Sequence, residues 1–67
     1  AVIEYYFSES DKQGLYVDIY DNVGLLYYHI EPTTYPIVLP SNLAVGIYNI
    51  KVVTGIGQIF NVKLIVN

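Results

Sequence analysis

Several residue types that carry chemistry are missing or scarce in this sequence. Cysteine is absent, which excludes disulfides, thiolate metal sites and a cysteine nucleophile. Arginine is absent as well, and three lysines against six acidic residues give a formal net charge of −3. Nucleic acids and anionic membranes carry negative charge too, so an acidic chain meets repulsion from them and gains nothing from counterion release. We therefore expect no nucleic-acid partner.

A long apolar run is also lacking. The longest uncharged stretch, 32–50, is interrupted by three prolines, by Asn42 and by Gly46, so we expect that the protein does not span a membrane. No basic or secretory leader segment precedes Ala1, which favours a processed piece or fragment of a longer protein.

The residues that are present favour one small all-β domain covering 1–67. The chain is 54% hydrophobic and 15% aromatic, which is too apolar for disorder and too aromatic for a coiled coil. Turn residues recur at roughly ten-residue intervals, the spacing of an antiparallel sandwich. The predicted strands are 2–7, 15–20, 25–30, 35–39, 47–54 and 58–66. We predict an immunoglobulin-like β-sandwich of about six strands, with a first strand as the element that could be missing.

No helix is expected. The segment 8–14, which contains Glu9 and Asp11, is interpreted as a solvated turn. Pro36 cannot donate to a strand ladder, so the fourth strand should be an edge or pair on one side only. A core this small supplies roughly 3 to 5 kcal/mol of net stability. A further strand from the parent chain or from a partner would cover an open sheet edge and raise that stability.

Two hairpins can be tested for consistency, since residues opposite each other in an antiparallel pair share a face. The first hairpin, closed on 21–24, is predicted to pair Ile19 with Leu26, Val17 with Tyr28 and Leu15 with Ile30 inside, and Tyr20 with Leu25, Asp18 with Tyr27 and Tyr16 with His29 outside. The second, closed on 55–57, is predicted to pair Val52 with Phe60, Ile50 with Val62 and Tyr48 with Leu64 inside, and Lys51 with Asn61 and Asn49 with Lys63 outside. A one-residue slip in the second would bury both lysines.

The remaining core residues come from the first and fourth strands. They are Ile3, Tyr5, Phe7, Tyr35, Ile37 and Leu39. On the outside of the second hairpin, Ile47 with Ile65 and Val53 with Ile59 form an apolar stripe beside the lysines. Such a stripe either packs under a missing strand or neighbouring domain, or marks a partner site.

The scarcity of catalytic residue types argues against an enzyme. The only histidine, His29, is interpreted as an ordinary exposed strand residue. Asp18, Asp21 and Glu31 do not follow the alternating pattern of a calcium-binding loop. The two-glycine turn at 55–57 lies within a hairpin, whereas a phosphate loop leads from a strand into a helix. We predict no catalytic residue, no cofactor and no metal.

Outward-facing tyrosines leave a binding function open. Tyr6, Tyr16, Tyr20 and Tyr27 are expected on outward faces, where their rings could stack on sugars or nucleobases. With only three lysines available, carbohydrate is the favoured ligand of the two.

The segment 43–48 has the spacing of a tyrosine corner. A leucine and a glycine, Leu43 and Gly46, precede Tyr48 at the start of a strand. In immunoglobulin-type sandwiches the hydroxyl of such a tyrosine bonds back to the preceding backbone. The role is structural, and it assigns the last two strands to the closing hairpin of the sandwich.

Three motifs from Leu15 to Asn67 carry a family resemblance. They are "VDIYDNVGLLYY", a strand, an Asp/Asn-rich turn with glycine, and a strand; "IVLPSNLAVGIYNIKVV", a short apolar strand with a Gly-Ile-Tyr corner; and "GQIFNVKLIVN", a strand in which branched apolar residues follow a lysine. In this order and spacing the chain resembles the type A C-terminal sorting domain of the type IX secretion system of Bacteroidetes. Gly24 and Leu43 occupy motif positions, and the positions implied in partner recognition are Gly46, Tyr48, Gly57, Lys63, Leu64, Ile65 and Val66.

The resemblance implies a non-catalytic secretion and sorting signal. A domain of this family is attached to an N-terminal cargo domain, crosses the periplasm, is recognised by the outer-membrane translocon and its shuttle protein, and is removed by a sortase-like peptidase or retained. The expected location is the cell surface or the medium. Two features depart from the family: its Pro-Asn-Pro element and first strand do not precede Ala1, and Asn61-Val62 stands where a second basic residue is frequent. The alternative is a structural or accessory immunoglobulin-like module, such as an adhesin stalk or a carbohydrate-binding accessory, of a secreted protein.

Overall fold

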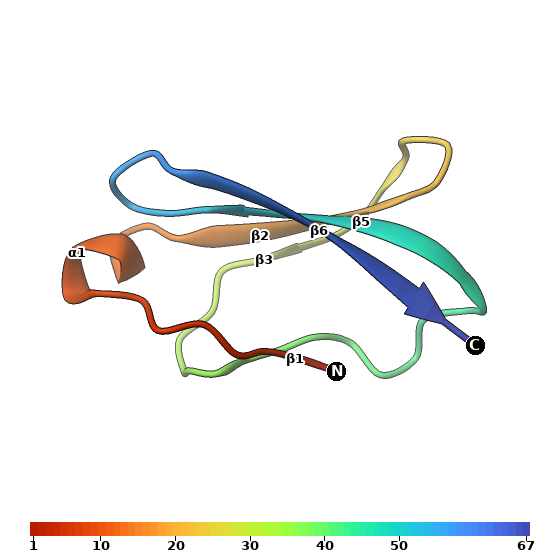
Figure 1. Ribbon diagram of the computed structural model, residues 1–67, viewed down its shortest axis with the longest axis horizontal. Helices are drawn as coiled ribbons and strands as arrows, with labels where there is room; N and C mark the ends of the chain where they lie inside the picture. The colour runs from red at the N-terminus through yellow and green to blue at the C-terminus, as the bar shows by residue number, and fades with distance from the viewer.

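Two antiparallel sheets face each other in the computed structural model, which describes all residues, 1–67 (Figure 1). The larger sheet has the order β3-β2-β5-β6, with strands β2 (Tyr16–Asp21), β3 (Leu26–Ile30), β5 (Gly46–Val53) and β6 (Ile59–Val66). The smaller sheet pairs β1 (Val2–Ile3) with β4 (Ile37–Val38). The predicted all-β sandwich of about six strands is therefore confirmed. The strand order corresponds to C′-C-F-G and B-E of an immunoglobulin sandwich.

Nine buried hydrophobic side chains form one core between the sheets. The members are Phe7, Leu15, Val17, Ile19, Ile37, Leu39, Tyr48, Ile50 and Val52. Val17, Ile19, Ile50 and Val52 lie on the inner face of the two central strands, β2 and β5, because alternate residues of a strand point to the same side. All nine belong to the predicted core.

The strands of the smaller sheet are shorter than predicted. β1 and β4 have two residues each, where strands over 2–7 and 35–39 were expected. β4 begins directly after Pro36 and pairs only with β1, which confirms the prediction of one-sided pairing there. Because so short a layer covers little of the larger sheet, Tyr5 and Val62, both predicted in the core, are exposed.

A four-residue helix contradicts the prediction of no helix. α1 (Glu9–Lys12) is closed by a capping box, in which the Ser8 hydroxyl accepts from the Asp11 N–H and the Asp11 carboxylate accepts from the Ser8 N–H, each at 3.1 Å. This reciprocal pair satisfies two amide donors that a helix start leaves free. The segment is thus a capped helical turn. The chain contains no helix of the length and apolarity needed to cross a lipid bilayer.

The first hairpin has a different register from the one predicted. Val17 lies opposite Ile30, Asp18 opposite His29, and Ile19 opposite Tyr28, whereas Tyr20 lies opposite Leu26. A bulge at Tyr27 accounts for the change of register between Ile19 and Tyr20. The predicted partner of Ile19, Leu26, therefore lies outside the core and is exposed. The inward placement of Val17, Ile19, Tyr28 and Ile30 was nevertheless right, since the shift along the ladder is two residues.

The second hairpin has the predicted register throughout. Tyr48 pairs with Leu64, Ile50 with Val62 and Val52 with Phe60 on the inner face. Asn49 pairs with Lys63 and Lys51 with Asn61 on the outer face.

Candidate functional site

The candidate site is the antiparallel hairpin of β5 and β6, called here the β5–β6 ribbon (46–66). It is the longest strand pair in the molecule, with eight residues in each strand. β5 is covered on its other side by β2, whereas β6 is an edge strand (Figure 1). The ribbon therefore offers both a face and an edge to a partner.

The outward face of the ribbon combines apolar and basic side chains. The pair Ile47 and Ile65 lies at one end and the pair Val53 and Ile59 at the other, as predicted. Ile65 is 61% exposed and Ile59 56% exposed. Lys51, Lys63 and two asparagines lie between these pairs. An exposed apolar stripe with polar groups along it is typical of an interaction surface.

The acidic residues lie in the first half of the sequence, and the charged residues on the outward face of the ribbon are all basic. All six acidic residues lie within 1–31, and Lys51 and Lys63 are the only charged side chains after residue 31. Neither lysine forms a salt bridge. Lys51 lies opposite Asp18 in the β2–β5 register, yet the Asp18 carboxylate contacts His29 instead. The ribbon is thus the basic part of an acidic domain, a signal that could have been found in the sequence.

The tyrosine corner is formed as predicted. The Tyr48 hydroxyl donates to the Ala44 carbonyl at 2.7 Å, and the ring is buried in the core. Burial raises the pKa of Tyr48, and the nearby Tyr27 and Asp21 raise it further. Tyr48 therefore fixes the bend at the start of β5, and its ring is not available to a partner.

The turn of the ribbon is docked onto α1, a contact that was not predicted from the sequence. The Gly55 N–H donates to the Asp11 carbonyl at 2.7 Å. A Cβ at Gly55 would lie 1.9 Å from the Gln13 carbonyl oxygen, so only glycine fits. Gly57 adopts a φ of +89°, which glycine reaches without steric cost.

The seven residues predicted for partner recognition fall into three groups. Lys63 and Ile65 lie on the outward face, and Leu64 and Val66 are half-buried on the inner face. Tyr48 and Gly57 shape the bend and the turn, and Gly46 is the first residue of β5. Only the first group is placed to contact a partner directly through the ribbon face.

His29 lies between two carboxylates on the outer face of the first hairpin. Its Nδ1 is 2.6 Å from Asp18 Oδ1, and its Nε2 is 3.0 Å from Glu31 Oε2. Hydrogen bonds to Asp18 and then Glu31 raise the pKa of His29. Tyr16, its predicted cross-strand partner, is a diagonal neighbour with the ring centroids 5.3 Å apart. Because both nitrogens are engaged, the ring has none left to take a proton from a substrate.

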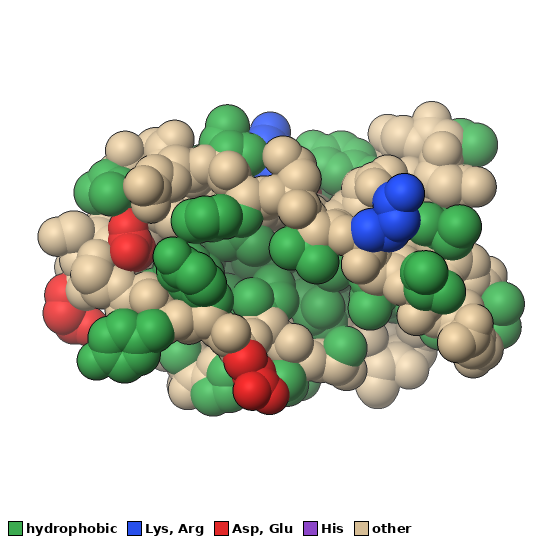
Figure 2. All heavy atoms as spheres, viewed as in Figure 1, with side chains coloured by type: hydrophobic (Ala, Val, Ile, Leu, Met, Phe, Trp, Pro, Cys, Tyr) green, Lys and Arg blue, Asp and Glu red, His purple; other side chains and the backbone are tan.

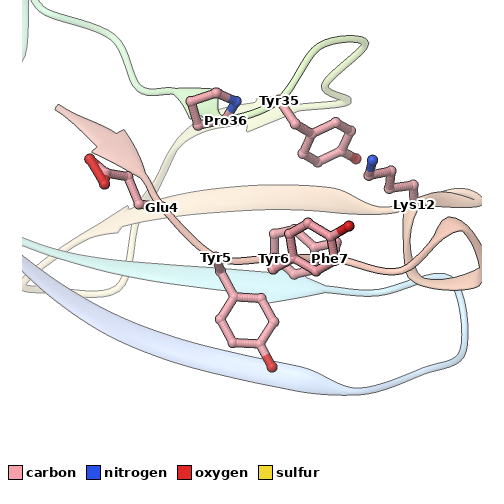
Figure 3. Close-up of a pocket in the computed structure, with 7 residues that line it drawn as sticks. All are labelled: Glu4, Tyr5, Tyr6, Phe7, Lys12, Tyr35 and Pro36. Atoms are coloured by element: carbon pink, nitrogen blue, oxygen red, sulfur yellow. The ribbon is translucent and has the colours of Figure 1, made fainter.

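An aromatic groove lies at the N-terminal segment, away from the ribbon face (Figure 3). It has a volume of about 400 Å³, and its lining includes Tyr5, Tyr6, Phe7 and Tyr35. The Lys12 amino group lies 4.8 Å from the centre of the Tyr35 ring, and Figure 3 shows it directed at that ring. The rings are tilted, with Tyr5 and Phe7 at 55°.

The four tyrosines predicted to face outward do not form one platform. Tyr6 is 96% exposed on the N-terminal segment, whereas Tyr16 and Tyr20 are half-buried on the outer face of β2. Tyr27, half exposed at the bulge, packs edge-on against the Tyr48 ring at 5.6 Å. The exposed tyrosines that lie together are Tyr5 and Tyr6, in the N-terminal groove.

No group of three or more histidine, cysteine, aspartate or glutamate side chains is placed to hold a metal ion. No protein-family model matches the chain, and no curated protein or solved structure matches it significantly. The family resemblance of the three motifs therefore stays a prediction.

Proposed function

We propose that the domain is a non-catalytic secretion and sorting module, which directs an attached cargo protein through the type IX translocon to the cell surface or medium. The partners would be the translocon, its outer-membrane shuttle protein and a sortase-like peptidase. The observation that carries the proposal is the outward face of the β5–β6 ribbon, where exposed Ile65 and Ile59 flank the only lysines that follow the acidic half of the chain. A mixed apolar and basic surface suits a receptor with acidic rim groups.

Rigidity of the ribbon supports a signal that is recognised while folded. The corner bond of Tyr48 fixes one end, and the docking of Gly55 on α1 fixes the other. A preorganised surface loses little conformational entropy on binding.

The proposal is tested by fusing the chain to a reporter cargo in a host with a type IX system. Lys63→Glu combined with Ile65→Asp changes the outward face and leaves the core untouched, and we expect export to fall at least tenfold. The matched control is Val23→Glu with Leu26→Asp, which places two carboxylates at exposed positions of the first hairpin, away from the ribbon, and should be exported normally. Full export of the ribbon variant, with its fold verified by circular dichroism, would contradict the proposal.

A second candidate, a carbohydrate-binding accessory module, is favoured by the aromatic groove. Tyr6 is almost fully exposed beside Tyr5 and Tyr35. Exposed aromatic rings contribute to ligand binding through stacking. Titration with a panel of polysaccharides should then give a binding signal that Tyr6→Ala weakens at least fivefold. Absence of binding by every polysaccharide would eliminate this candidate.

A further inference from the structure

The edge of β6 carries little of the protection that natural edge strands usually have. Eight residues lie at the margin of the larger sheet and pair on one side only, with β5. No backbone hydrogen bond outside this ladder involves Ile59–Val66. The strand contains no proline or glycine, and Lys63 is its single charge. Edge strands are usually short, bulged, charged or covered, and β3 at the opposite margin has a bulge.

The sandwich is also open beside β6. A groove of about 110 Å³ between the two sheets is lined only by hydrophobic side chains, among them Ile3, Tyr5, Phe60 and Val62. Figure 2 shows hydrophobic side chains around a hollow in the middle of this face. Val62 is 50% exposed there, although its cross-strand partner Ile50 is 2% exposed. A strand added to β6 would cover this side of the core.

We propose that the occupant of this edge is the β6 strand of a second copy, paired antiparallel about a two-fold axis at Val62. In such a pair, residues directly opposite must share a face, so only odd with odd or even with even numbers can meet. Centring on Val62 places Phe60 opposite Leu64 on the inner face. It places Ile59 opposite Ile65, and Asn61 opposite Lys63, on the outer face.

Pairing about an axis one residue away, at Lys63 or at Asn61, would be less stable than pairing about Val62. An axis at Lys63 brings two lysines directly opposite each other, which destabilises a pair. An axis at Asn61 sets Ile59 against Lys63 and leaves Leu64–Val66 without partners. Charge and polarity therefore select the register at Val62.

The strand sequence itself argues for a second copy as the partner. From Ile59 to Ile65 the residues read Ile-Phe-Asn-Val-Lys-Leu-Ile, with apolar and polar positions symmetric about the central valine. A strand that pairs with itself across a two-fold axis needs this symmetry, because each residue must match its mirror position. A strand that pairs with an unrelated segment has no such requirement. The inference does not depend on the proposed sorting function, since the outward face stays uncovered.

Sedimentation velocity of the 67-residue chain at increasing concentration tests the inference. We expect a monomer of 7.6 kDa to convert into a species of twice that mass, with a Kd on the order of 10 to 100 μM, because one strand pair is a small interface. Val62→Lys sets like charges on the axis and should weaken the dimer at least tenfold. Leu26→Lys is the matched control, because it adds the same charge at a similarly exposed position of the other edge strand, and it should leave the dimer unchanged.

Cysteine cross-linking tests the register and does not require Val62→Lys to fold. The chain has no cysteine of its own, so each introduced thiol is unique. In air-saturated buffer, with dissolved oxygen as the oxidant, Val62→Cys should form a disulfide dimer rapidly, and Lys63→Cys alone slowly. A mixture of Asn61→Cys and Lys63→Cys should form the mixed dimer faster than either alone. A chain that stays monomeric up to 1 mM (roughly tenfold above the expected Kd range) would overturn the proposal in favour of another occupant. Cross-links that favour position 63 with itself would overturn the pairing about Val62.

Discussion

The two hairpins of the larger sheet close with the same turn chemistry but continue into different ladders. Asp21 in the first and Thr54 in the second hold equivalent positions: the N–H of each donates to the carbonyl four residues on, at 2.9 Å in both. The side-chain oxygen of Asp21 also accepts from the Leu25 N–H, and that of Thr54 accepts from the Gln58 N–H. A glycine three residues on has a positive φ in both, 92° at Gly24 and 89° at Gly57.

The two hairpins differ in whether the register that the turn sets would place the apolar residues of both strands on the inner face. In the second hairpin it does, and the ladder is regular from Thr54 to the far end. In the first, a regular ladder from the Asp21 turn would set His29 opposite Val17, on the inner face. The bulge at Tyr27 adds one residue to β3 and returns Tyr28 and Ile30 to that face. Turn chemistry thus sets the register locally, and burial corrects it further along.

The largest expected change in the free energy of unfolding comes from a substitution in the second turn, and the equivalent substitution in the first turn should have little effect. Gly55→Ala should destabilise the protein by roughly 3 kcal/mol, because the added methyl group would overlap the backbone of α1. Asn22 holds the equivalent place in the first turn, and Asn22→Ala should change the free energy of unfolding by less than about 0.5 kcal/mol. Urea denaturation measures both. Equal changes in the free energy of unfolding would mean that the contact between the second turn and α1 does not stabilise the protein.

The corner tyrosine of β5, Tyr48, and the bulge tyrosine of β3, Tyr27, differ in their hydrogen bonding. Tyr48→Phe should cost about 1 to 2 kcal/mol, because it removes the hydroxyl donor to the Ala44 carbonyl. The Tyr27 hydroxyl has no hydrogen bond within the chain, and Tyr27→Phe should be nearly neutral. Thermal unfolding of the two variants provides the comparison, and a neutral Tyr48→Phe would refute a stabilising corner.

Deleting Tyr27 should convert the first ladder into one as regular as the second. The residues on either side, Leu26 and Tyr28, already lie opposite Tyr20 and Ile19, so the inner face is unchanged. We expect a folded protein that is weaker by about 1 kcal/mol, since the edge-on contact with the Tyr48 ring is lost. Amide chemical shifts would verify the pairing. An unfolded deletion variant would show that the bulge itself is needed.

The smallest effect is a pH dependence confined to the first hairpin. The pKa of His29 is raised in the folded state above its ordinary 6.5, by Asp18 and then Glu31. This contribution to stability is fully present below pH 6.5 and is lost as the pH rises through the folded pKa, above that value. Urea midpoints should therefore decline slightly across this range, and His29→Gln should abolish the decline. A decline that persists in the variant would assign it to another group.

Much of the fold is encoded in patterns that can be read along the chain. The register of the second hairpin follows from Lys51 and Lys63, since either would be buried by a slip, and the corner follows from the spacing of Gly46 and Tyr48. The bulge could not be predicted, because tyrosine tolerates both faces of a strand and Tyr27 carries no clear polarity. The Ser8–Asp11 spacing is that of a capping box, so α1 could have been predicted from it. The docking of Gly55 on α1 joins distant segments, and only the structure reveals it.

The contact between Gly55 and α1 also bears on how the chain folds. Each hairpin joins neighbouring segments and can form early, whereas the bond from Gly55 to Asp11 closes a long loop and loses more chain entropy. Docking of α1 is thus expected after the transition state, so that Gly55→Ala accelerates unfolding and leaves the folding rate nearly unchanged. The glycine would then act as a kinetic latch, which governs how long the native state persists once it has formed.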